Sequence, residues 1–132
     1  MSHLEIAKRY IEILNDPDST PADLEPLLAP DLQQTALPNA LSPRGGTRDR
    51  AAVLEGFVRG KELIERQHFE ILREFTDGDE VVLEVSWEGR LRRAVGSLQV
   101  GTTLRADVAI FLEFADSRIR RQRNYDCYHQ VG

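Results

Sequence analysis

The sequence has one cysteine, Cys127, so it can form neither an internal disulfide nor a cysteine-based metal cluster. Its histidines, His3, His68 and His129, lie far apart, and no two have the spacing of metal ligands on one helix. A glycine-rich phosphate loop is also missing, because the glycine pair at 45–46 is only a turn before a helix. We therefore expect a protein that uses neither a metal ion nor an organic cofactor.

Long apolar stretches and a concentrated basic surface are missing too. The longest apolar runs are far too short for a bilayer, and charges interrupt residues 4–14, unlike the core of a signal peptide. A net charge of -5 disfavours contact with phosphates. The arginines between residues 118 and 123 are expected to pair with acidic side chains of neighbouring strands. We therefore expect a cytoplasmic protein that binds neither nucleic acid nor a membrane.

The composition is that of an ordinary folded domain. The chain has 132 residues, of which 41% are hydrophobic and 30% are charged, values that disordered chains do not reach together. This length is enough for one hydrophobic core and too short for two. We expect a single domain over residues 1–132.

Three helices are expected in the first half of the chain. Residues 4–14 place apolar side chains every three or four positions, the period of one helical stripe, with charged residues opposite. Thr20 followed by Pro21 is typical of a capped helix start, and this short helix is expected to end near Pro30. A third helix is expected to open at residues 47–50 and to end between residues 60 and 64.

Strands are expected in the second half. All six prolines lie in the first third of the chain, so residues 33–46 should form a loop with one short strand over residues 32–36. After residue 67 the hydrophobic period changes to two, and Gly89 interrupts it in the manner of a bend or bulge. Helices followed by antiparallel strands are typical of an α+β fold. The later strands are expected at 68–75, 81–88, 102–114 and 119–128.

Short sequence motifs in a fixed order carry a resemblance that spans nearly the whole chain. They are Arg9-Tyr10-Ile11-Glu12, Leu27-Leu28-Ala29-Pro30-Asp31, Gly46-Thr47-Arg48-Asp49, Asp77-Gly78-Asp79-Glu80-Val81-Val82, Trp87-Glu88-Gly89 and the terminal strand 119–128. In this order the chain resembles the nuclear transport factor 2-like superfamily, in its branch of SnoaL-like polyketide cyclases and ketosteroid isomerases. The resemblance implies a cone-shaped, curved antiparallel sheet packed on three N-terminal helices around a pocket, a cystatin-like half barrel. It also implies a homodimer paired through the convex face of the sheet.

The alternation of side chains then assigns residues to the two faces of the sheet. The resemblance implies that Trp87 faces the pocket, and period two puts its apolar neighbours on the same face. The last strand presents either Gln122, Asn124 and Asp126 or the arginines and Tyr125 between them. We expect the first set, because arginines are easier to solvate outside than to enclose. The expected pocket-lining residues are Phe57, Leu83, Val85, Trp87, Val108, Ile110, Leu112 and Gln122.

Asp126 is the candidate for proton transfer. A carboxylate on the concave face loses part of its hydration, which raises its pKa and suits it to act as a base or an acid. The resemblance adds that SnoaL-like cyclases keep an acidic residue on this strand; Asn124 lies nearest that position, with Asp126 two residues later. The alternatives for Asp126 are an exposed position at the end of the strand and an ion pair with an arginine.

Asn124 and Tyr10 are the candidates for binding a substrate oxygen. Asn124 can donate to a carbonyl or enolate oxygen, or equally satisfy a backbone group nearby. Tyr10 matches the helix-one tyrosine that ketosteroid isomerases use in their oxyanion hole, where a phenol stabilises developing negative charge. The alternative for Tyr10 is a core aromatic side chain of the helix stripe.

Two departures from the relatives narrow the chemistry. Ketosteroid isomerases have an acidic base just after the second helix, where this chain has residues 33–37, and a second acid on the long strand, where it has Ile110. Both acids are missing, which excludes that mechanism. The Asp-Arg-Asp network of limonene epoxide hydrolases would need Asp107, Arg123 and Asp126, but alternation puts the first two on the convex face.

The sequence therefore predicts a pocket for a small apolar or cyclic organic ligand, resembling the pockets of SnoaL-like cyclases and isomerases. If the protein is an enzyme, the expected reaction is proton abstraction next to a carbonyl without a cofactor. Asp126 would move the proton, and Asn124 and Tyr10 would hold the oxygen. The alternative is a non-catalytic ligand-binding or assembly module on the same fold, which the missing loop acid favours.

Overall fold

The two long helices, α1 and α3, each begin at a side chain that caps the helix. In the computed structural model, which describes residues 1–131, the Ser2 hydroxyl accepts a hydrogen bond from the Glu5 amide at 3.1 Å, and Asp49 accepts one from the Ala52 amide at 2.9 Å. Gly132, the last residue of the expected domain, lies outside the described residues. The helices are α1 (His3–Asn15), α2 (Pro21–Leu24), the 3₁₀ turn η1 (Glu25–Leu27) and α3 (Arg50–Leu63).

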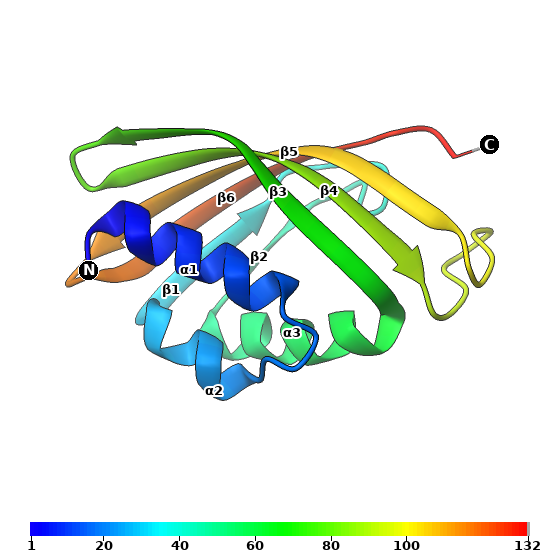
Figure 1. The fold of residues 1–132 in the computed structure, drawn as a ribbon, viewed down its shortest axis with the longest axis horizontal. Coiled ribbons are helices and arrows are strands. Elements are labelled where there is room, and N and C mark those ends of the chain that lie inside the picture. The colour runs from blue at the N-terminus through cyan, green and yellow to red at the C-terminus, as the bar shows by residue number, and fades with distance from the viewer. Residues whose placement is uncertain (132) are drawn as a thin grey trace.

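The strands form one sheet of six in the order β2-β1-β6-β5-β4-β3. Figure 1 shows this sheet curving over α1, α2 and α3, which all lie on its concave side. The α+β class and the curved sheet over three helices are confirmed. None of the described helices is long and apolar enough to cross a membrane. The strands are β1 (Leu28–Ala36), β2 (Gly46–Arg48), β3 (Ile64–Asp77), β4 (Glu80–Leu91), β5 (Thr103–Ala115) and β6 (Arg118–Tyr128).

The region after α2 differs from the expectation. The second helix was expected to reach Pro30, yet β1 begins at Leu28, which pairs with Ile119 in a parallel arrangement. Leu28 and Ile119 are both fully buried, so the apolar contact between distant segments outweighs local helix propensity. The strand β2 was also not foreseen, and it takes residues assigned to the start of the third helix.

Burial in β4 and β5 alternates strictly. Every second side chain is buried and the reverse side chains are partly exposed, because one face packs on the helices and the other meets solvent. Burying one large apolar side chain contributes about 1.5–3 kcal/mol, so a one-residue slip of either strand is strongly disfavoured. The buried rows are Val81, Leu83, Val85 and Trp87 on β4 and Val108, Ile110, Leu112 and Phe114 on β5.

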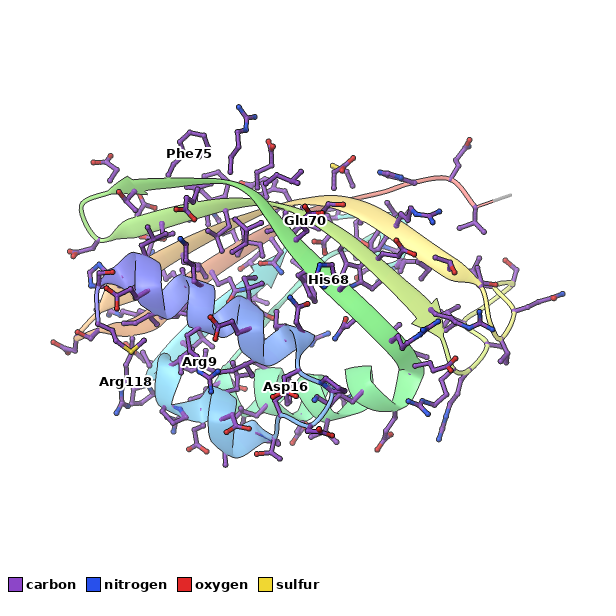
Figure 2. All side chains as sticks on the ribbon, in the orientation of Figure 1. Arg9, Asp16, His68, Glu70, Phe75 and Arg118 are labelled. Carbon is purple, nitrogen blue, oxygen red and sulfur yellow. The ribbon has the colours of Figure 1, made fainter. Side chains whose placement is uncertain are left out.

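The irregularity in strand pairing lies at a different residue from the one that the sequence predicts. Pairing runs without a shift through Gly89, where a bend or bulge was expected, whereas the β3 register shifts between Ile71 and Arg73. The shift changes the face that follows it. Phe75 therefore pairs with Val82 and is 54% exposed, and Figure 2 shows it directed away from the helices. Gly89 serves a different purpose, because its missing side chain leaves room for the ring of Trp87.

Candidate functional site

The concave side of the sheet holds a hollow of about 220 Å³, which we call the inner pocket. Its apolar wall comes mainly from α3 and the sheet, and its polar groups come from α1, β1, β2, β3 and β6. An apolar wall with a few convergent polar groups is typical of a small-molecule site. The lining residues are Tyr10, Leu14, Leu24, Gln34, Arg48, Val53, Gly56, Phe57, Gly60, Gln67, Phe69, Ile110 and Asn124.

A second hollow of about 380 Å³, the outer pocket, adjoins the inner one at Arg48, which lines both. Asp126 and Tyr128 line the outer pocket from β6. Asn124 and Asp126 are two residues apart on this strand, so their side chains share a face and their Cα atoms are about 7 Å apart. The other lining residues come from the β1–β2 connection: Ala36, Asn39, Leu41, Ser42, Gly45, Gly46 and Thr47.

A buried amide joins two of the candidate residues. Gln122 is only 1% exposed, and its Nε2 donates to the Tyr10 hydroxyl at 3.1 Å and to Asn124 Oδ1 at 2.9 Å. Both partners use an oxygen as the acceptor. The hydroxyl hydrogen of Tyr10 and the Nδ2 group of Asn124 are therefore free to donate to a ligand. Gln122 Oε1 is buried and accepts no hydrogen bond from residues 1–131.

A second polar contact connects Trp87 to the inner pocket. The indole Nε1 donates to Gln67 Oε1 at 3.1 Å, and Gln67 Nε2 donates to the Leu14 carbonyl at 3.4 Å. Trp87 itself is 9% exposed and packs edge-on against the ring of Tyr128, with centroids 6.0 Å apart. Its role is to hold Gln67 and Tyr128, which reach the two pockets.

Burial raises the pKa of three ionisable side chains that line the pockets, Tyr10, Asp126 and Tyr128. Burial raises the pKa of Asp126 above the ordinary value of an aspartate. Burial also raises the pKa of Tyr10; the hydrogen bond from Gln122 opposes that shift, and the charge of Asp126 adds to it. For Tyr128, burial and then the charge of Asp126 raise the pKa to about 12. Both phenols therefore keep their protons at neutral pH and can only donate or accept hydrogen bonds.

The predicted lining residues divide between the pocket and the core. Phe57 and Ile110 line the inner pocket. The remaining apolar ones belong to the hydrophobic cluster that includes α1, because this helix packs against the same face of the sheet. Gln122 lies behind Tyr10 and Asn124 rather than in the wall. The residues of that cluster are Leu83, Val85, Trp87, Val108 and Leu112.

Three polar lining residues were missed by sequence reasoning. Gln34 lies in the segment 33–37, where ketosteroid isomerases have their base, and this correspondence was the available signal for it. Gln67 lies where the hydrophobic period changes, and no local pattern marks it as inward-facing. Arg48 lies in one of the sequence motifs that carry the resemblance, just before the helix cap at Asp49. This position was the only available signal for Arg48.

The convex face holds the residues that alternation assigned to it. Arg123 pairs with Glu113 at 3.0 Å, and Asp107 contacts His129 at 2.9 Å. These contacts keep Asp107 and Arg123 away from Asp126, so no Asp-Arg-Asp network forms. Within residues 1–131 no group of three His, Cys, Asp or Glu side chains is placed to hold a metal ion.

Comparison with known proteins identifies the relatives of this chain. A family model described as a SnoaL-like domain matches residues 7–122. No curated protein matches the chain by sequence. The match to the family model covers most of the chain, and it ends before Asn124, Asp126 and Tyr128.

Several solved structures share the fold. IdmH from Streptomyces antibioticus, a proposed polyketide cyclase, has 18% identity and a TM-score of 0.79, covering 96% of this chain and 92% of that one. A protein from Catenulispora acidiphila with a ketosteroid isomerase-like fold, solved with trimethylamine, has 21% identity and a TM-score of 0.73, covering 92% and 84%. An epoxide hydrolase from M. tuberculosis has 16% identity and a TM-score of 0.74, covering 94% and 81%. At these identities the likeness shows the fold alone.

Proposed function

We propose that this chain, which belongs to the SnoaL-like domain family, binds a small apolar organic molecule in its pocket. The protein then removes a proton from the carbon next to the carbonyl group of that molecule. The observation that carries this proposal is the Gln122 amide, which hydrogen-bonds both Tyr10 and Asn124 through their oxygens. This arrangement leaves two donors free in the inner pocket, and Asp126, two residues after Asn124 on β6, lines the adjoining outer pocket. A base next to two donors is what enolate formation requires.

The reaction would use three side chains. The ionised carboxylate of Asp126 takes a proton from the carbon next to the carbonyl. The electron pair of the broken C–H bond forms a C=C bond, and negative charge develops on the carbonyl oxygen. Tyr10 Oη and Asn124 Nδ2 donate hydrogen bonds to that oxygen. Returning the proton from Asp126 to another carbon completes an isomerisation. In a cyclisation the enolate carbon bonds to a second carbonyl carbon of the same molecule, the π bond of that carbonyl breaks to leave an alkoxide, and the proton held by Asp126 is transferred to the alkoxide.

Burial adjusts each group to this role. A raised pKa makes the ionised carboxylate of Asp126 a stronger base than that of an exposed aspartate. The buried phenol of Tyr10 stays protonated, as a hydrogen-bond donor must. The unpaired Gln122 Oε1 lowers the free energy of unfolding, because a buried acceptor without a partner loses its hydration and gains no hydrogen bond in exchange.

The substrate is expected to be small and largely apolar. Phe57, Phe69 and Ile110 present hydrophobic surface to the inner pocket, whose volume of about 220 Å³ suits one or two rings. Among the structures of similar fold, the Catenulispora acidiphila protein was solved with trimethylamine, and IdmH is a proposed polyketide cyclase. A protein that binds such a ligand without chemistry remains the alternative, favoured by glutamines where ketosteroid isomerases have their base.

Deuterium exchange separates catalysis from binding. We expect the protein to accelerate exchange of the α-protons of 2-tetralone, a cyclic ketone, in D₂O, measured by proton NMR. Exchange needs only the base and the oxygen donors, so the natural substrate is not required. Saturable binding of 2-tetralone with exchange at the buffer rate would support the binding module and overturn the proposed catalysis.

The exchange rate should depend on pH through Asp126. Only the ionised carboxylate accepts a proton, so the rate should rise as pH increases through a pKa above the ordinary value of about 3.9. Stability should change in the opposite direction. Between the two values the folded chain holds a proton that the unfolded chain has lost, so the free energy of unfolding falls as pH rises. Exchange kinetics and urea unfolding between about pH 4 and pH 8 measure both trends, and Asp126→Asn should lack both.

The proposal includes a homodimer paired through the convex face. Phe75 is 54% exposed there, and Phe111 packs edge-on against Tyr125 with centroids 5.4 Å apart, so apolar surface is available between the ion pairs. Light scattering at micromolar concentration should give twice the 15.0 kDa chain mass. Phe75→Glu should shift the mass to the monomer, whereas Val100→Glu, at a loop position that is also exposed, should not. A monomeric wild-type protein would contradict this prediction.

A further inference from the structure

A third hollow, of about 470 Å³, is lined by arginines from three separate elements. Arg48 comes from β2, Arg59 from α3 and Arg93 from the segment that follows β4. We call it the arginine hollow. Its remaining lining residues are Gly56, Gly60, Glu62 and Leu63.

The backbone segments that carry these three exposed arginines are anchored. Arg48 pairs with Gln34 in the sheet, and Arg59 lies within a helix of fourteen residues. The amide of Arg92 donates to the Leu63 carbonyl at 2.8 Å, which fixes the segment carrying Arg93 against the end of α3. The hollow is therefore formed by three anchored segments rather than by one flexible loop.

None of the three arginines has an acidic partner within residues 1–131. Acids are not scarce, because the chain has 22 acidic and 17 basic residues, and on the convex face Arg73 and Arg123 pair with glutamates at 2.9 and 3.0 Å. The only carboxylate in the hollow is that of Glu62, so three positive charges meet one negative charge. The hollow is a local positive site on an acidic protein, which favours an anion.

Arg48 connects this hollow to the proposed substrate site. Arg48, Gly56 and Gly60 line both the arginine hollow and the inner pocket, and Arg48 also reaches the outer pocket beside Asp126. A Cβ atom at Gly56 would collide with Nη1 of Arg48, so the guanidinium lies directly against α3 at the junction. One ligand can therefore place an apolar part in the inner pocket and a second part among the arginines.

We propose that the arginine hollow binds an anionic oxygen group, a carboxylate or a phosphate, on the ligand whose apolar part occupies the inner pocket. Guanidinium groups bind both anions through paired N–H donors, and three of them around one hollow accept an anion in more than one orientation. This inference rests on the proposed pocket but not on its chemistry. It names the substrate class as an apolar carbonyl compound with an anionic tail.

Two dyes that differ in one charged group test this proposal. 1-Anilinonaphthalene-8-sulfonate carries a sulfonate, and N-phenyl-1-naphthylamine is the same aromatic system without it. We expect wild-type protein to bind the anionic dye more tightly, in fluorescence titrations at low salt. Arg48→Gln, Arg59→Gln and Arg93→Gln should each weaken the anionic dye by about tenfold, as expected for loss of a charge-assisted hydrogen bond, and the neutral dye by less than about twofold. Arg118→Gln is the matched control, since Arg118 has no ion pair within residues 1–131 and lies on β6, outside the lining of this hollow.

The relative losses of affinity for the two dyes distinguish an anion site from a purely structural role of the arginines. Equal losses for both dyes would mean that Arg48 only shapes the pocket, and unchanged affinities would mean that the dye binds elsewhere; either result overturns the proposal. So would wild-type protein with no preference for the anionic dye. Competition by 1-naphthoate and by 1-naphthyl phosphate identifies the preferred anion, and failure of both to displace the dye contradicts the site. The dye titrations do not depend on catalysis: wild-type protein that prefers the anionic dye but shows no deuterium exchange would overturn the catalytic proposal and leave the anion site standing.

Discussion

Asp126→Asn should reduce the deuterium-exchange rate of 2-tetralone by about 10²- to 10⁴-fold, the usual contribution of a positioned general base. Asparagine has nearly the shape of aspartate but no basic oxygen. The neighbouring donors, Tyr10 and Asn124, would still bind the ketone. The loss should therefore fall on kcat, with KM changed little, because the substrate binds before the proton moves.

The same variant should fold at least as well as the wild-type protein. Burial raises the pKa of Asp126, which means that the folded chain holds the ionised carboxylate at a disadvantage. A neutral amide removes that disadvantage at neutral pH. Asp107→Asn is the control on the convex face and should keep the full exchange rate. Unfolding of Asp126→Asn would identify a structural carboxylate, and an unchanged rate would remove Asp126 from the mechanism.

Gly89→Ala should lower the free energy of unfolding by about 1–3 kcal/mol, the usual effect of overpacking. A Cβ atom at this position would lie 2.5 Å from Cζ2 and 2.9 Å from Cη2 of Trp87. Gly89 is paired to Gln67 and to Leu104, so the backbone on both sides resists a shift. The indole would have to move and would break its hydrogen bond to Gln67, which lines the inner pocket.

The single tryptophan gives a direct reading of that movement. Urea unfolding measures the stability, and a changed emission maximum of the folded protein reports the displaced indole. Gly60→Ala is the matched control, because a Cβ atom there meets nothing within 4 Å and alanine favours the helix interior by about 0.5–1 kcal/mol. Opposite signs for the two variants are expected. Equal stability of Gly89→Ala and wild-type protein would mean that the ring is loosely held.

The candidate site was only partly accessible to sequence reasoning. Alternation placed Asn124 and Asp126 on one face of the last strand, because period two is a local property that any extended segment obeys. It could not reveal the contact between Gln122 and Tyr10, which are 112 positions apart. Nor could it identify Arg48, whose side chain reaches three hollows only because β2 joins the sheet beside α3.

The sequence by itself determined the inward rows of β4 and β5 and the α+β order, since each depends on neighbours within a few residues. Tertiary structure decided the rest. Leu28 became a strand residue by pairing with Ile119, and Phe75 changed faces because the β3 register shifts before it. The pocket follows from the same long-range packing: α1 covers one part of the concave face and leaves the part beside Phe57 open. Such pairings depend on the free energy of the whole sheet, which no local pattern contains.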